Sequence, residues 1–307
     1  MSGQLTIRWA EQTLNAFFNK TLGTKSVDYI IAIDTDSLYI DCSKLMGEIF
    51  PDAISDKQLG VKILDEYCVK VIEPLLEKAY KELKEYMHAF AQKMVMKREV
   101  IADKGIWTGK KHYILNVYNS EGVNYKEPEL KIMGIEAVKS STPKVCRTMI
   151  KDTIKIIMNS DEKSTQEYIR EMREQFFKEK PEDVAFPRGV SDLEKYHDRN
   201  TTYVKGTPIH CRGALLYNKL LKHYNIENKY PPILSGDKLK FVYLKTPNMI
   251  NENVIAFQTV IPDEFRLKSF VDYDVQFEKS YLEPMKAILN TIHWSAERRA
   301  TLEALFS

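Results

Sequence analysis

The 307-residue sequence predicts an α+β fold, with helices packed on an antiparallel sheet and a mostly helical region after it. Two apolar runs rich in isoleucine and tyrosine flank a polar turn at residues 34–37, as in a β-hairpin. Segments with apolar residues at helical spacing lie between further strand-like runs. Strands and helices do not alternate as repeated βαβ units, so an α+β architecture is favoured over an α/β one.

The individual elements follow from periodicity and from turn residues. Residues 4–20 place apolar side chains on one helical stripe, which Gly23 should end. Residues 57–94 read as mostly helical, and Pro74 should kink or break that helix. The expected strands and turn of the first half are Tyr29–Ile33, Leu38–Ile40, Met94–Ala102, His112–Tyr118, Asn119–Gly122 (the turn) and Leu130–Gly134. After Thr142 the expected helices are Pro143–Met158, Thr165–Phe177 and Gly213–His223, with strands at Lys240–Leu244 and Val254–Phe257 and a last helical segment.

Composition limits the classes of protein that the chain can belong to. Its length suits two domains or one large one. The formal net charge is only +2, so any nucleic-acid surface must be a local patch. The cysteines show no C-x-x-C spacing, which is typical of reduced thiols in a cytoplasmic protein; they are Cys42, Cys68, Cys146 and Cys211. No signal peptide and no apolar run of about 18 residues occurs, so no membrane span is expected.

The stretch YIIAIDTDSLYIDC, residues 29–42, places two acidic residues between two apolar strands. Side chains of extended chain repeat with period two, so Asp34 and Asp36 can point to the same side. Two carboxylates this close repel each other unless a cation lies beside them. Oxygen ligands without histidine or cysteine favour Mg²⁺ or Mn²⁺ over zinc.

Three interpretations of this hairpin remain open from its residues alone. It can be a solvated turn whose acids face water. It can belong to a phosphatase with an aspartyl nucleophile, but that fold needs alternating strands and helices, a later lysine and a further acidic pair. The later candidate, Ser235–Lys240, lacks the second acid. The third interpretation is the metal-binding hairpin of a nucleotidyl-transfer enzyme.

Six segments in a fixed order carry a resemblance that favours the third interpretation. They are DTDSLY, MVMKREVIA, WTGKKHYILNVY, LKIMGIEAVKSSTP, PIHCRGALLYN and GDKLKFVYL. In this order the chain resembles the palm and thumb of family B DNA polymerases, and it is most similar to the replicative polymerases of T-even-type phages. The match spans essentially the whole chain. It implies that residues 1–140 are the C-terminal portion of the palm and residues 141–307 the thumb.

The resemblance implies a DNA-directed DNA polymerase that works by two-metal nucleotidyl transfer with Mg²⁺ and a dNTP. Asp36 matches the aspartate that bridges the two metals, and Asp34 matches its neighbour. Glu99 matches an acidic residue near the catalytic site; its alternative is a surface glutamate on a strand. DNA contacts are implied for Lys110, Lys111, Tyr113, Lys139, Ser140, Ser141, Arg212 and Asn218.

Two groups of these residues also have ordinary structural explanations. Lys110 and Lys111 can meet minor-groove acceptors and phosphates of the primer–template, or they can be a solvated pair beside a strand. Residues 139–141 can hold phosphates, but Thr142 can equally be the N-cap of a helix that starts with Pro143.

The sequence departs from the family pattern near the expected site. Ala32 and Ile33 stand where the family usually has Tyr-Gly, which removes backbone freedom and an aromatic contact near the primer end. Lys97 takes a place where phage relatives tend to carry an acid, and His112 replaces the usual arginine. No change removes a metal ligand.

Three family features are missing from the sequence: the exonuclease domain, the D-x-x-S-L-Y-P-S segment with the first catalytic aspartate, and the K-x-x-x-N-S-x-Y-G fingers helix. A two-metal site without half of its bridging acids should not turn over. We therefore expect a split polymerase whose N-terminal polypeptide is another chain, with a truncated fragment as the alternative. The starting Met1 and the helix-competent residues after it favour a split gene. The helix bearing Leu5, Trp9 and Leu14 is the expected docking face.

Residues 298–307 are expected to bind a sliding clamp, as the tails of the resembling phage polymerases do. Leu302, Leu305 and Phe306 are spaced i, i+3 and i+4, so one helical turn presents all three on one face. The alternative is a terminal helix folded on the thumb. The alternative function for the whole chain is a non-catalytic DNA- and clamp-binding module, which has little use for adjacent acids beside a polyanion. A phage-encoded chain would work in the host cytoplasm.

Overall fold

The computed structural model describes residues 2–297, and the chain divides into two compact units, Met1–Lys131 and Ile132–Ser307. Helices and small antiparallel sheets occur in both units, which confirms the predicted α+β class. The expected domain boundary at residue 140 lies just inside the second unit and remains a prediction. Among residues 2–297, no helix is long and apolar enough to cross a membrane.

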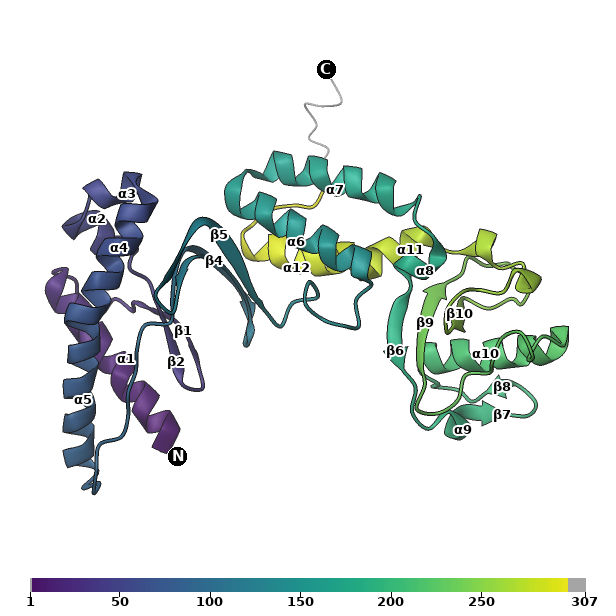
Figure 1. Ribbon diagram of the computed structural model, residues 1–307, viewed down its shortest axis with the longest axis horizontal. Coiled ribbons are helices and arrows are strands. Elements are labelled where there is room, and N and C mark those ends of the chain that lie inside the picture. The colour runs from purple at the N-terminus through teal and green to yellow at the C-terminus, as the bar shows by residue number, and fades with distance from the viewer. Residues whose placement is uncertain (1, 298–307) are drawn as a thin grey trace, which may run out of the picture. The chain divides into compact units, whose positions relative to one another are not determined.

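Two long helices form the core of the first unit. Helices α1 (Ser2–Thr21) and α5 (Glu73–Tyr86) lie side by side (Figure 1). Leu14 and Phe18 of α1 are buried together with Leu76 of α5. The expected docking face on α1 is therefore wrong in part, because this chain's own α5 already covers Leu14.

The helical segment that precedes α5 is interrupted where the sequence places Pro74. Helix α4 (Lys57–Tyr67) passes into a π turn, η1 (Cys68–Ile72), and α5 begins directly afterwards. Proline has no N–H to donate and its ring clashes with the carbonyl four residues earlier, so a wider turn accommodates it. The sequence predicted a kink or a break at Pro74; the structure has a π turn before it, within a helical segment that ends at Tyr86 and not at residue 94.

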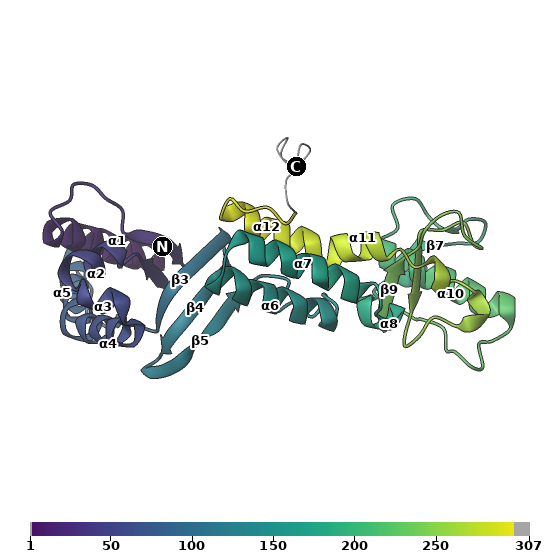
Figure 2. The ribbon, with the colours of Figure 1, turned by 90° about the horizontal axis from the view of Figure 1, so that it is seen from above.

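Two sets of antiparallel strands complete the first unit. Strands β1 (Ile30–Asp34) and β2 (Ser37–Ile40) form the predicted hairpin, and Asp34 pairs with Ser37 across a two-residue turn. A second sheet has the order β3-β4-β5 (Figure 2). Its strands are β3 (Val100–Gly109), β4 (His112–Ser120) and β5 (Val123–Met133). In sequence, the short helices α2 (Ser43–Ile49) and α3 (Asp52–Ser55) follow the hairpin.

The second sheet differs from the expected strands at its start. The expected strand Met94–Ala102 exists only from Val100 onward, because residues 94–98 pair with no strand of the described part of the chain. The turn between β4 and β5 lies at Glu121 and Gly122, whose φ angles of 49° and 88° suit a type I′ hairpin. All residues from Tyr113 to Asn119 are buried in the central strand β4.

The second unit combines a helical part with a small sheet. The expected helices are present as α6 (Lys144–Asn159), α7 (Glu162–Phe176) and α10 (Ile209–Tyr224), and the chain continues through α11 (Tyr273–Phe277), the π turn η4 (Glu278–Leu282) and α12 (Glu283–Thr291). The buried hydroxyls of Thr153 and Tyr281 lie 2.6 Å apart and join α6 to η4.

The sheet of the second unit has the order β10-β9-β6 and packs against α10 (Figure 1). Strands β9 (Lys238–Tyr243) and β10 (Val254–Phe257) were expected, whereas β6 (Phe186–Gly189) was not. Gly213 lets α10 approach β10 closely, since a Cβ there would lie 2.9 Å from the Ala256 nitrogen. Short elements complete the unit: α8 (Pro181–Val184), α9 (Leu193–Tyr196), β7 (His197–Asp198) and β8 (Thr202–Tyr203).

Candidate functional site

Two tight turns of the first unit meet at one place. The β1–β2 turn carries Asp34, and the β3–β4 turn carries Lys111. The Lys111 Nζ lies 3.7 Å from the Asp34 Oδ1, so the two charged groups form an ion pair. Thr35 and Lys111 have φ angles of 52° and 60°, in the left-handed region that such turns use. The structure thus brings together two of the motifs that the sequence singled out.

An aromatic cluster holds the two turns against each other. The Tyr39 ring of β2 lies 5.5 Å from the Trp107 ring of β3 and 5.3 Å from the Tyr113 ring of β4. Burial, and then a hydrogen bond with Tyr113, raise the pKa of the Tyr39 hydroxyl, so it stays protonated. Tyr113 was expected to contact DNA, but its side chain is buried in this cluster. Its role in the structure is to position the hairpin.

The two aspartates of the hairpin have different surroundings. Asp34 is half-buried, and its carboxylate accepts a hydrogen bond from the Thr35 hydroxyl at 3.2 Å. Ser37 donates to the Asp34 carbonyl oxygen at 3.0 Å and stiffens the turn. Asp36 lies in the turn itself and not in a strand, so the period-two argument does not set its direction. Its carboxylate is exposed and has no hydrogen-bond or ionic partner among residues 2–297.

These two carboxylates can supply part of a magnesium site. Within the described part of the chain, no three His, Cys, Asp or Glu side chains are grouped so that they could hold a metal. Mg²⁺ is commonly bound by one or two carboxylates together with substrate phosphates and waters. The carboxylate oxygens of Asp34 and Asp36 therefore suit Mg²⁺ chemically, but the site needs further oxygen donors.

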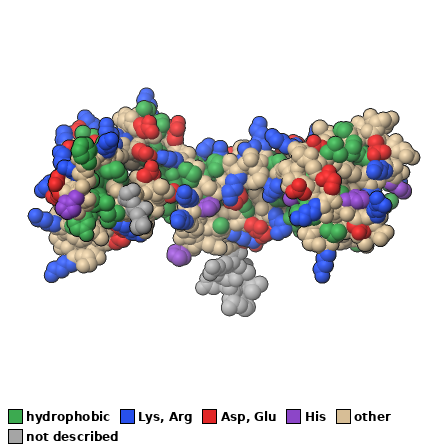
Figure 3. All heavy atoms as spheres, turned by 90° about the horizontal axis from the view of Figure 1, so that it is seen from below, with side chains coloured by type: hydrophobic (Ala, Val, Ile, Leu, Met, Phe, Trp, Pro, Cys, Tyr) green, Lys and Arg blue, Asp and Glu red, His purple; other side chains and the backbone are tan. Residues whose placement is uncertain are grey.

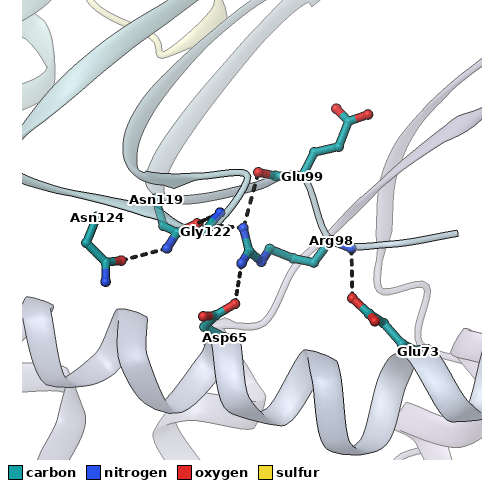
Figure 4. A network of polar contacts seen from close by, with 7 residues as sticks. All are labelled: Asp65, Glu73, Arg98, Glu99, Asn119, Gly122 and Asn124. Carbon is teal, nitrogen blue, oxygen red and sulfur yellow. Dashed lines mark hydrogen bonds and ion pairs between the residues drawn. The ribbon is translucent and has the colours of Figure 1, made fainter.

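Glu99 is not placed with the two aspartates. It precedes β3, whereas Lys111 follows the end of that strand, and a 10-residue strand spans about 30 Å. The Glu99 carboxylate is exposed, and its nearest cation is the Lys131 Nζ at 3.9 Å. In Figure 4 this carboxylate points away from the neighbouring polar network. The position agrees better with the alternative of a surface glutamate than with a catalytic one.

The residue before Glu99 anchors a network that the sequence analysis missed (Figure 4). The Arg98 guanidinium, largely buried, pairs with Asp65 of α4 and donates to the Asn119 Oδ1 of β4 at 2.5 Å. Its main-chain N–H donates to Glu73 of α5 at 3.2 Å. Arg98 therefore ties the helices on both sides of the π turn to the sheet. Its partners are distant in sequence, so no local signal points to it.

Lys139 and Ser141 lie beside a cavity in the second unit. Lys139 forms an ion pair with Glu136 at 2.8 Å, and Arg188 donates to the Ser141 carbonyl at 2.7 Å. Lys139, Ser141, Arg188 and Lys279 are among the residues that line this cavity of about 500 Å³. Ser140 is exposed. Thr142 is buried and does not cap α6, because Pro143 occupies the N-cap position.

Arg212 and Asn218 on α10 are bound to groups of the protein. Arg212 donates to the Asn253 side chain at 2.6 Å and lies 5.6 Å above the Tyr203 ring. The Asn218 amide donates to the Ile233 carbonyl at 2.7 Å and accepts from the Ile233 N–H at 2.8 Å. Asn218 thus has a structural task. The expected clamp-binding residues lie outside the described residues; they are Leu302, Leu305 and Phe306.

Comparison with known proteins gives two curated relatives of phage origin. The DNA-directed DNA polymerases of Enterobacteria phage T4 and of Escherichia phage RB69 are each 32% identical to this chain over 316 residues. Each match covers 99% of this chain but 35% of the relative. The chain is thus homologous to phage DNA polymerases and spans about a third of their length. No protein-family model matches it.

Proposed function

We propose that this chain is the palm remainder and thumb of a replicative DNA-directed DNA polymerase. The proposal is supported by homology along 99% of the chain. The proposal depends above all on the ion pair between Lys111 and Asp34, whose charged atoms are 3.7 Å apart. This ion pair joins the Asp34 hairpin, which is predicted to bind metal, to the Lys111 turn, which is predicted to bind DNA. In this proposal residues 1–140 belong to the palm and residues 141–307 to the thumb.

The chain's own residues have distinct tasks in this function. Asp34 and Asp36 would hold Mg²⁺, and the bound metal would supply Lewis-acid chemistry for nucleotidyl transfer to the primer 3′-hydroxyl. Lys111 neutralises part of the Asp34 charge, and its ammonium is exposed enough to move to a DNA phosphate. Lys110 lies beside it on the same turn and binds the duplex non-specifically. Both turns are held by the aromatic cluster, which preorganises them.

The remaining polymerase parts belong to an N-terminal polypeptide with exonuclease and fingers. The first catalytic aspartate and the fingers helix do not occur in the 307 residues. Most of the length of the curated relatives has no counterpart in this chain, since it covers 35% of each. The proposed ligands are primer–template DNA and a dNTP, and residues 298–307 would bind a sliding clamp. The working place is the host cytoplasm if the gene belongs to a phage.

Primer extension with purified proteins tests the function. The chain alone should extend no primer, because its metal site lacks a carboxylate. Added to the polypeptide of the same genome that carries the D-x-x-S-L-Y-P-S and K-x-x-x-N-S-x-Y-G motifs, it should give extension that requires Mg²⁺. Robust extension by the chain alone would contradict the split enzyme. A mixture that binds DNA and clamp without extending would favour the non-catalytic module.

A further inference from the structure

The first unit exposes a run of large apolar side chains directly after α5. Phe90 is fully exposed, and Val95 and Tyr86 are 79% and 69% exposed. Met87 and Met94 add to the same segment. Figure 3 shows hydrophobic side chains gathered over the first unit at the left of the view. Contiguous exposed apolar side chains are rare on monomeric proteins and mark interaction sites. We call residues 86–97 the apolar segment.

The main chain at the end of the apolar segment is also unpartnered. Among residues 2–297, the main-chain groups of Val95, Met96 and Lys97 make no hydrogen bond. The side chain of Met96 packs inward, and the Tyr80 hydroxyl lies 3.8 Å from its sulfur, while Val95 and Lys97 point outward. This alternation is that of a β-strand. An extended segment with free N–H and C=O groups can accept a strand from another chain.

The border of the apolar segment indicates the kind of partner. Residues 86–98 contain no Asp or Glu, and Lys93 and Lys97 have no ionic partner in the described part of the chain. At one end, the Tyr86 ring lies 5.5 Å from the Trp9 ring of α1. Leu5 extends the apolar surface along the start of α1. A fitting partner presents apolar side chains with acidic side chains around them.

We propose that the apolar segment is the docking surface for the polypeptide that supplies the missing polymerase parts. This inference rests on the proposed function and names where the two chains join. The partner adds a strand to Val95–Lys97, covers Phe90 and Tyr86, and places acidic groups beside Lys93 and Lys97. The occupant follows from the length of the curated relatives, most of which has no counterpart here, since the chain covers 35% of each.

Titration calorimetry with the motif-bearing polypeptide of the same genome tests the docking. Phe90→Glu and Val95→Glu should each weaken binding at least about tenfold, because a charge is then buried in an apolar interface. Both side chains are exposed, so neither change should alter the fold. Met249→Glu is the matched control, since Met249 is 62% exposed in the second unit. It should leave binding unchanged.

Hydrogen exchange of the full chain gives a second readout. The amides of residues 95–97 should exchange fast in the free chain, because they have no hydrogen-bond partner among the described residues, and slowly in the complex. Amides that remain fast in a tight complex would overturn the added strand. Binding that survives both substitutions overturns the docking surface. A genome without the motif-bearing polypeptide overturns it as well.

Other occupants give different results. A concentration-dependent dimer of the free chain that Phe90→Glu abolishes would assign the surface to a second copy. Loss of binding to a single-stranded oligonucleotide in the same variant would assign it to nucleic acid. Either result overturns the proposal. If the mixture extends primers although Phe90→Glu binds the partner normally, the proposed docking surface is wrong and the proposed polymerase function stands. If binding depends on Phe90 but the mixture extends no primer, the polymerase function is wrong and the docking surface stands.

Discussion

The hairpin tip of the first unit and helix α10 of the second unit both carry polar residues that match polymerase residues. They differ in whether these side chains are exposed or bonded to other groups of the protein. At the tip, the Asp36 carboxylate has no hydrogen-bond or ionic partner within residues 2–297, and the Lys111 side chain is 60% exposed. On α10, Asn218 uses its amide for both main-chain groups of Ile233. A residue that matches the family can therefore be left exposed in one place and be used by the fold in the other. Substitutions should separate the two roles.

The largest effect should follow from Asp36→Asn in the reconstituted enzyme. Asparagine keeps the shape of the side chain but removes the negative charge that a divalent cation needs. We expect primer extension to fall by about 10³-fold or more, as for loss of an essential electrostatic group, while DNA binding stays within a factor of about two. Steady-state extension and filter binding measure the two quantities. Retention of most activity would show that Asp36 holds no metal.

Asn218→Ala should lower stability and leave DNA affinity unchanged. The buried N–H and C=O of Ile233 lose their partner, which costs about 1–3 kcal/mol of unfolding free energy. Urea unfolding measures this cost. Asn159→Ala is the control, because Asn159 is exposed near the end of α6 and bonds one carbonyl, and it should cost less. A large loss of DNA affinity without loss of stability would give Asn218 a ligand-binding role.

Lys111→Ala should have a moderate effect on duplex binding in the reconstituted enzyme. Each lost phosphate contact removes about one unit from the slope of log affinity against log salt. The fold should change little, because an exposed ion pair contributes about 0–1 kcal/mol. Lys44→Ala removes the same charge from α2, where Lys44 pairs with Glu48, and should leave the slope unchanged. Equal slopes for both variants would exclude a phosphate contact at Lys111.

The smallest effect should appear in the pH dependence of the strand that leads to the hairpin. The Ile30 N–H, and then the Asn15 amide, hold the pKa of Asp28 below its usual value of 3.8. The ionised carboxylate therefore stabilises the fold above pH ~4, and this contribution is lost as the pH falls through the lowered pKa. Asp28→Asn should be less stable than the parent chain at pH 7, with a smaller difference at pH 3. Thermal unfolding at both values measures it.

The sequence predicted the elements that depend on local patterns. Helices α6 and α7 are close to their expected bounds, and α10 is present but begins at Ile209 and not at Gly213; each has a clear apolar stripe. Strand β6 was missed, since Pro187 and Gly189 within four residues give no strand signal. Residues 94–99 have a strand pattern, but a strand also needs a neighbour, which a local pattern does not reveal.

The parts of the site that depend on local motifs were also predictable, whereas those that depend on distant contacts were not. The hairpin and the lysine turn were found as motifs, and the structure places them together. The Arg98 network was not found, because Arg98 reaches Asp65 and Asn119, which are 33 and 21 residues away. The burial of Tyr113 and the bonds of Asn218 likewise depend on contacts that only the folded chain reveals.

The π turns described above have a consequence for how the chain tolerates changes in its length. The π turn Cys68–Ile72 precedes Glu73-Pro74, and the π turn Glu278–Leu282 precedes Glu283-Pro284, so both units contain a π turn directly before a Glu-Pro pair. A π turn holds one residue more than an α turn, which offsets the helical phase by about 100°. Deleting Val69 would remove the extra residue of the π turn that accommodates Pro74 and would rotate α4 relative to α5. Asp65 and Glu73 could then no longer face Arg98 together, so a one-residue deletion here should be far more harmful than a substitution.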